Sequence, residues 1–187
     1  ADVTDDARSV TRDPDIDIVV ELIGGYGIAR ELVLDAIAHG KHVVTANKAL
    51  LAEHGLELIA AARRHNRNLA FEASVCGEIP VIDVVSKMPS SDDVQSITAI
   101  MNGTSNYLLT MMADGQNYED ALHAAQVGGF AEADPYMDVS GSDAAQKLSI
   151  LAGLVFHTGV DWKRIHRTGI DRVRSVDMRS AARMGMA

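Results

Sequence analysis

Four carboxylates and a lysine lie close together in the second half of the sequence. Glu132, Asp134 and Asp138 fall in an aperiodic stretch, and Asp143 and Lys147 follow one helical turn apart at the start of an apolar segment. A lysine partly removed from water beside a carboxylate can be tuned to give and take a proton. The same carboxylates could hold Mg²⁺ or Ca²⁺, or Asp143 and Lys147 could form an ordinary helical ion pair worth about 0.2–0.5 kcal/mol. The pattern leaves an enzyme, a metal site and a solvated acidic loop as alternatives.

A second lysine, Lys48, comes directly after a short strand pattern. Ligands bind at the carboxyl ends of the strands in open parallel sheets, and a lysine there can contact a phosphate, a carboxylate or a carbonyl oxygen. A solvated lysine at the start of a helix would fit this position equally well. Upstream, Gly25-Tyr26-Gly27 also follows a strand pattern, but it continues to Arg30 where the dinucleotide-binding fingerprint has glycine or alanine. We interpret it as a simple glycine turn.

The elements that would position these residues alternate between strand and helix in the first half of the chain. Apolar and β-branched runs predict strands at 16–23, 41–46 and 69–75, and helical spacing predicts helices over 28–39 and 50–66. The nearly continuous apolar run at 16–23 is typical of a parallel strand buried on both faces. Three strands joined by two helices predict an α/β fold with a doubly wound parallel sheet.

The pattern changes in the second half, and we place a domain boundary between 1–78 and 79–187. The expected elements are helices over 80–88, 104–113, 117–127 and 142–157, a polar loop at 90–93 and a strand over 94–101. Thr104, Asn117 and Ser142 are the expected N-terminal caps of the last three helices. The second domain is therefore expected to be α+β.

Composition excludes several classes of protein. The 187 residues carry a net charge of −9, which argues against binding to nucleic acid or to an anionic membrane surface. No run reaches about 18 apolar residues, so a transmembrane helix is not expected. The single cysteine, Cys76, excludes an internal disulfide and fits a cytoplasmic location. The seven histidines lack the spacing of zinc ligands.

Five segments of the sequence carry a family resemblance. They are VVELIGG (19–25), GKHVVTANKALLA (40–52), FEASVCGEIPVI (71–82), NGTSNYLL (102–109) and AQVGGFAEADPYMDVSGSDAAQKLSIL (125–151). In order and spacing they resemble the homoserine dehydrogenases. The resemblance implies a partial Rossmann-like nucleotide-binding sheet followed by an α+β catalytic and dimerisation domain. It also implies a cytoplasmic homodimer or homotetramer.

The family reduces aspartate semialdehyde to homoserine with NADH or NADPH, reversibly, in the biosynthesis of threonine, methionine and isoleucine. By resemblance, Lys147 gives and takes the proton of the substrate oxygen, and Asp143 orients substrate and lysine. Glu132 matches the glutamate that binds the substrate amino group, and Asp138 lies in the same pocket. Which of NAD and NADP is preferred does not follow from these residues.

The resemblance assigns further residues to the cofactor, the substrate and a cation. Lys48 matches a lysine at the junction of cofactor and substrate, Gly129 matches a backbone contact to the cofactor, and Thr104 matches a substrate contact. A structural sodium site is implied at Glu72, Val75, Gly77 and Ile79, built largely from backbone carbonyls.

The sequence departs from the family at three places. The family's N-terminal segment with its G-x-G-x-x-G turn has no counterpart, Cys76 and Glu78 stand where glycine is usual, and the chain stops soon after Met184, before the family's returning C-terminal helix. We therefore expect an internal fragment of the enzyme that is inactive alone. The alternative is a cofactor-incompetent remnant that acts only as an oligomerisation or substrate-binding module.

Overall fold

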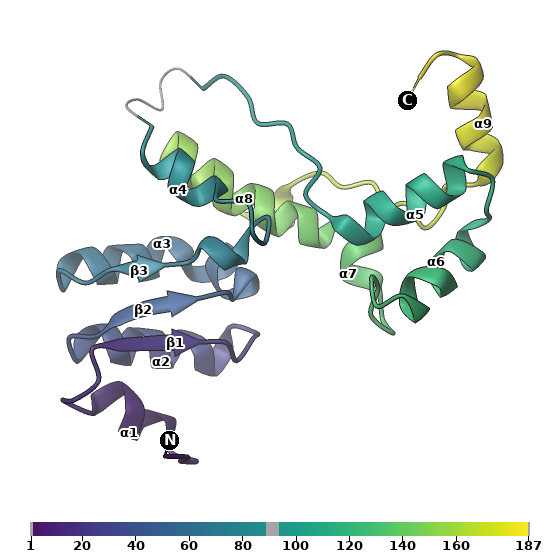
Figure 1. The fold of residues 1–187 in the computed structure, drawn as a ribbon. Coiled ribbons are helices and arrows are strands. Elements are labelled where there is room, and N and C mark those ends of the chain that lie inside the picture. Colours follow the sequence, from purple (N-terminus) through teal and green to yellow (C-terminus); the bar gives the residue numbers. More distant parts are fainter. Residues whose placement is uncertain (1, 89–93, 187) are drawn as a thin grey trace. The chain divides into compact units, whose positions relative to one another are not determined.

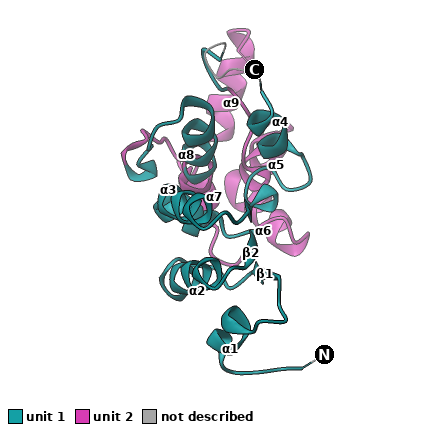
Figure 2. Cartoon of the chain, turned by 90° about the vertical axis from the view of Figure 1, so that its left-hand side faces the viewer, with its two compact units in different colours: residues 1–97, 146–163 teal, residues 98–145, 164–187 magenta. Residues whose placement is uncertain are grey.

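The computed structural model describes residues 2–88 and 94–186, so the loop predicted at 90–93 lies outside the described residues. The chain divides into two compact units, each built from two separate stretches of sequence. The first unit comprises residues 1–97 and 146–163, and the second comprises 98–145 and 164–187 (Figure 2).

The first unit contains a parallel sheet of three strands in the order β1-β2-β3 (Figure 1). Its strands are β1 (Ile18–Glu21), β2 (His42–Thr45) and β3 (Leu69–Ala70), joined by α2 (Gly27–Ala38) and α3 (Lys48–Arg64). The register pairs Val20 with Val44 and Val44 with Ala70. The predicted α/β class and parallel strand order are confirmed, although each strand is shorter than expected.

Among the described residues, helices cover one face of this sheet, and the side chains on the other face are exposed. Val43 points into a core with Val33 and Ile37 of α2 and with Leu50 and Leu58 of α3. On the opposite face, Ile18, Val20 and Val44 are 57%, 59% and 40% exposed. The prediction that strand 16–23 is buried on both faces is therefore wrong for this chain. Successive side chains of a strand point to opposite faces, and α2 and α3 pack on the same one.

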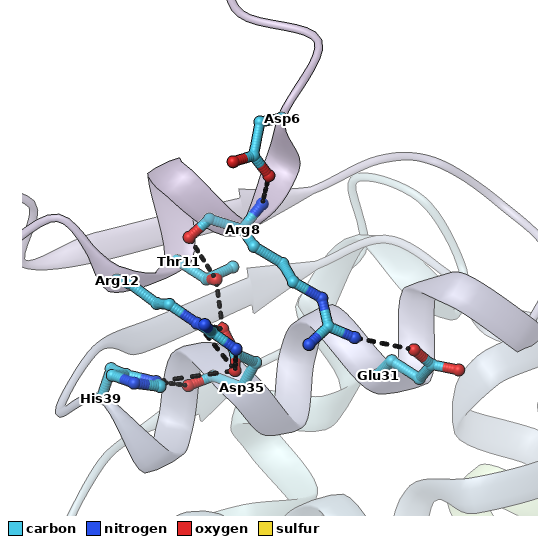
Figure 3. A network of polar contacts seen from close by, with 7 residues as sticks. All are labelled: Asp6, Arg8, Thr11, Arg12, Glu31, Asp35 and His39. Atoms are coloured by element: carbon cyan, nitrogen blue, oxygen red, sulfur yellow. Dashed lines mark hydrogen bonds and ion pairs between the residues drawn. The ribbon is translucent and has the colours of Figure 1, made fainter.

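A short helix that the sequence did not predict, α1 (Ala7–Arg12), is attached to α2 by a polar network. The network comprises Asp6, Arg8, Thr11, Arg12, Glu31, Asp35 and His39 (Figure 3). At its centre, the buried Thr11 hydroxyl donates to Asp35 Oδ2 at 2.5 Å, and Arg12 Nη2 donates to Asp35 Oδ1 at 2.9 Å. The Arg12 guanidinium and the Thr11 hydroxyl hold the pKa of Asp35 well below its ordinary value.

The rest of the first unit follows β3. A 3₁₀ turn, η1 (Glu72–Ser74), replaces the second half of the strand predicted at 69–75, and α4 (Val81–Ser86) follows it. Most of α8 (Ser142–Phe156) and the start of a second 3₁₀ turn, η3 (Trp162–Arg164), complete the unit.

Helices and the connections between them make up the described residues of the second unit, which contain no strand. Its elements are α5 (Gly103–Ala113), α6 (Tyr118–Val127), α7 (Tyr136–Val139), the first residues of α8, and α9 (Ser175–Arg183). Leu108 and Met112 of α5 pack with Ala121 and Ala125 of α6 and with Val139 of α7. Among the helices described, none is both long and apolar enough to cross a lipid bilayer.

Two predictions for the second half are wrong. Residues 94–101 form no strand, because no other strand among the described residues lies beside them to complete a hydrogen-bonded ladder. The cap of α5 is Asn102, whose side chain accepts from Ser105 N, and not Thr104. The predicted cap of α6 at Asn117 is confirmed. The helix α8 includes Ser142 as its first residue, and the capping role predicted for Ser142 stays a prediction.

Candidate functional site

Two of the predicted carboxylates, Asp138 and Asp143, converge on one asparagine in the second unit. Asn102 Nδ2 donates to Asp138 Oδ1 at 2.7 Å and to Asp143 Oδ2 at 2.9 Å. Asn102 Oδ1 accepts from the backbone N–H of Ser105 at 2.7 Å and so caps α5. Asn102 is 9% exposed and Asp143 is 4% exposed. In the sequence, Asn102 stands out only as the first residue of the motif at 102–109, and no role was predicted for it.

The elements around this cluster fix each carboxylate. Asp138 lies on the single turn of α7, and its backbone carbonyl accepts from Ser105 Oγ at 3.1 Å. Asp143 lies in the first turn of α8, where the positive end of the helix dipole favours a negative charge. Gly141 joins the two helices with a φ of 78°, a left-handed conformation that favours glycine. A short connection therefore brings both carboxylates to the start of α5.

The loop that carries Gly129 is tied to the first turns of α5. Thr104 Oγ1 donates to Phe130 O at 2.7 Å, and the Phe130 ring stacks on Tyr107 with 5.0 Å between ring centroids. Gly129 has a φ of 74°, so the loop turns sharply there. The hydroxyl of Thr104, the predicted substrate contact, donates its one hydrogen bond to this loop. Its oxygen can still accept a hydrogen bond from a substrate.

Glu132 follows the same loop and is exposed. Gln126 Nε2 at the end of α6 donates to the backbone carbonyl of Glu132 at 3.1 Å. The backbone is therefore fixed while the carboxylate stays accessible to water. An exposed carboxylate on a fixed backbone suits the recognition of a soluble ammonium group.

Lys147 lies one helical turn after Asp143 on α8, as the sequence predicted, and is half-buried. Its neighbours further along the helix, Ile150 and Leu151, are buried. Lys147 therefore lies on a largely buried stretch of α8, where a charge is screened less than in bulk water.

Lys48 is the first residue of α3 in the first unit, and Ala46 and Asn47 separate it from the carboxyl end of β2 at Thr45. The buried Glu21 at the end of β1 accepts from Thr45 Oγ1 at 2.6 Å and from Asn47 Nδ2 at 3.3 Å. Asn47 Nδ2 also donates to Gly25 O at 2.6 Å. This network, which was not predicted from the sequence, connects the carboxyl ends of β1 and β2 by hydrogen bonds near Lys48.

The carboxylate of Glu72, a residue of the predicted sodium site, caps α4. Its two oxygens accept from the backbone N–H groups of Ile82 and Asp83, each at 2.9 Å. Its side chain is therefore engaged, and a cation would meet its backbone carbonyl. Residues 2–88 and 94–186 contain no group of three or more His, Cys, Asp or Glu side chains placed to hold a metal ion.

The loop after Glu72 can present backbone oxygens. Cys76 and Gly77 have φ values of 62° and 58°, and two successive left-handed residues fold the chain back on itself. The carbonyl of Ile79 already accepts from Val81 N at 2.7 Å, but each carbonyl oxygen has a second lone pair. Hard oxygen donors of this kind suit an alkali cation.

The fold and the placement of these residues define a class of protein. Parallel strands with polar groups gathered at their carboxyl ends are typical of an α/β nucleotide-binding domain. Residues 1–72 match the family model for the homoserine dehydrogenase NAD-binding domain, and residues 80–187 match the model for homoserine dehydrogenase. The chain belongs to the homoserine dehydrogenase family, as its motifs predicted.

Similar proteins agree with this assignment. The homoserine dehydrogenase of Pseudomonas aeruginosa is 47% identical over 184 residues, which are 98% of this chain and 42% of that protein. A crystal structure of a homoserine dehydrogenase from Thiobacillus denitrificans superposes with a TM-score of 0.86 at 44% identity, covering 97% of this chain and 42% of the other. A hyperthermophilic archaeal homoserine dehydrogenase in complex with NADPH gives a TM-score of 0.81 at 28% identity, covering 90% and 52%. The chain thus spans 42% of the length of the first two of these proteins and 52% of the third.

Proposed function

We propose that the protein carrying this chain interconverts homoserine and aspartate semialdehyde with NAD or NADP, in the cytoplasmic biosynthesis of threonine, methionine and isoleucine. The observation that carries the proposal is the convergence of Asp138 and Asp143 on Asn102. Of these residues, Asp143 lies one helical turn before Lys147 on α8. Family membership over nearly the whole chain supports it.

Each proposed catalytic or substrate residue has a chemical task. The nicotinamide, when bound, supplies or accepts the hydride. Lys147 would meet the charge on the substrate oxygen and give or take its proton, and Asp143 would orient that lysine and the substrate. Glu132 would bind the substrate ammonium group, with Asp138 in the same pocket.

The remaining site residues are proposed for the cofactor, the substrate and a cation. Lys48, near the connected strand ends, would contact cofactor and substrate, Gly129 would contact the cofactor through its backbone, and Thr104 would accept from the substrate. Backbone carbonyls of Glu72, Val75, Gly77 and Ile79 would hold a structural sodium ion. The proposed domains are 1–78 and 79–187, and the proposed assembly is a homodimer or homotetramer.

The test is an activity assay on the protein produced from its complete gene. With L-homoserine and NAD⁺ or NADP⁺, we expect formation of the reduced nicotinamide that depends on homoserine. Calorimetry with L-homoserine runs in parallel. Binding of homoserine without any reduction of either nucleotide would contradict the proposal and favour a cofactor-incompetent remnant.

A further inference from the structure

Asn102 makes three hydrogen bonds through one side chain, and only one of them serves its own helix. The oxygen accepts from Ser105 N and caps α5, while the nitrogen donates to Asp138 on α7 and to Asp143 on α8. A backbone N–H can only donate, and an ionised carboxylate can only accept, so the amide has one possible orientation. Both of its N–H groups are committed to carboxylates.

We propose that Asn102 is a positioning residue of the homoserine site, which sets the directions of the Asp138 and Asp143 carboxylates from the start of α5. This inference rests on the proposed function, because that function gives those two carboxylates their substrate. Two like charges held close together repel each other. An amide between them offers each a donor without adding charge, and it fixes both against the same rigid helix end.

A second asparagine shows what capping alone requires. Asn117 caps α6 in the same way, with its oxygen accepting from Asp120 N at 2.8 Å and its nitrogen donating to Asp120 Oδ2 at 2.7 Å. All of these contacts stay within the first turn of its own helix and are exposed. Asn102 instead reaches 36 and 41 residues along the chain. The two residues therefore form a matched pair for mutation.

The test compares Asn102→Asp with Asn117→Asp in the protein produced from its complete gene. Aspartate is an equally good N-cap, so both helices keep their caps. At position 102 the change removes two donors and places a third carboxylate beside the others. We expect KM for homoserine to rise about 10-fold and kcat to fall about 10-fold, as for a displacement of about 1 Å at a reacting centre. KM for the nucleotide should stay within about two-fold of wild type.

The rise in KM for homoserine separates positioning from a structural defect. A variant that only loses folded molecules lowers kcat and leaves every KM unchanged. Asn117→Asp should keep all three constants within about two-fold of wild type. If Asn102→Asp also keeps kcat and KM for homoserine within about two-fold of wild type, the proposal is overturned.

Crystal structures of wild type and Asn102→Asp provide a readout that does not depend on the proposed function. We expect the Asp138 and Asp143 carboxylates to turn away from position 102, with oxygen shifts of about 1 Å or more. Unmoved carboxylates would overturn the positioning role. If wild type does not oxidise homoserine at all, the proposed function fails, and these two structures still decide the role of Asn102.

Discussion

Lys147 is the residue on which the proposed chemistry depends most. We expect Lys147→Met to fold normally and to lose about 10²–10⁴-fold in kcat, the range for removing a general acid. Methionine keeps the length and packing of the lysine stem while removing its charge and its proton. Steady-state kinetics on aspartate semialdehyde, with a melting curve, measure both effects.

The matched control for this substitution is Lys163→Met. Lys163 Nζ pairs with Glu53 Oε1 at 2.6 Å, and its side chain is 53% exposed. An exposed pair contributes about 0–1 kcal/mol, so this variant should keep the turnover of wild type. A Lys147→Met enzyme within a few-fold of wild type would remove Lys147 from the mechanism.

The backbone of Cys76 is in a strained conformation, and the cost of that conformation can be measured. Its φ of 62° is left-handed, which costs a residue with a Cβ about 1–2 kcal/mol. Glycine at position 76 would remove this cost, but part of the gain would be offset because glycine loses more conformational entropy on folding. We expect Cys76→Gly to stabilise the protein by about 0.5–1 kcal/mol in denaturant melts. Cys76→Ala keeps the Cβ and should give no stabilisation, so an equal gain from alanine would show that strain is not the cause.

At the residue scale, the sequence predicted contacts that are local and missed those that are not. The spacing of Asp143 and Lys147 is a helical turn, and a helix was predictable there. Asn102 and its partners are separated by 36 and 41 residues, and Glu21 lies 24 residues from Thr45. Such networks depend on how elements pack, which composition and periodicity do not encode.

At the element scale, α1 is attached to α2 chiefly through Asp35. We expect Asp35→Asn to lower Tm by about 2–4 °C near neutral pH. The folded pKa of Asp35 lies below its unfolded value, 3.8. Its stabilisation is therefore complete above that value and is lost as pH falls toward the folded pKa.

A pair of melting series across pH tests this link. The difference in Tm between wild type and Asp35→Asn should persist from neutral pH down to about 5 and should shrink below about 4. The control is Glu31→Gln, which removes the carboxylate of the exposed pair with Arg8 and should change Tm little at any pH. A difference for Asp35→Asn that does not vary with pH would contradict the assignment.

The long helices were all predicted, whereas of the short elements α4 was predicted and α1 was missed. The helices α2, α3, α5, α6 and α8 were predicted to within a few residues, because each buries an apolar stripe. The helix α1 has six residues and one buried side chain, and α9 has none buried. At 94–101 the strand prediction failed, because a strand is completed by a neighbour that the segment itself does not contain.

At the scale of the whole molecule, the exposed sheet face and the sequence of the turn after β1 both bear on cofactor binding. The face formed by Ile18, Val20 and Val44 is apolar and exposed among the described residues, and the turn after β1 reads G-x-G-x-x-R. The pyrophosphate of a dinucleotide is held by backbone N–H groups of a glycine turn at a helix N-terminus. The sheet is therefore a partial platform, with Lys48 at one edge.

We accordingly expect the 187-residue chain expressed alone to bind NADPH poorly and to turn over slowly or not at all. It should bind a hydrophobic dye through its exposed sheet face, and Val20→Thr with Val44→Thr should reduce that signal. The protein produced from the complete gene, titrated with NADPH in the same calorimeter, is the reference for affinity. Micromolar binding of NADPH by the 187-residue chain would show that its residues suffice for the cofactor, and the explanation from its G-x-G-x-x-R turn would then be wrong.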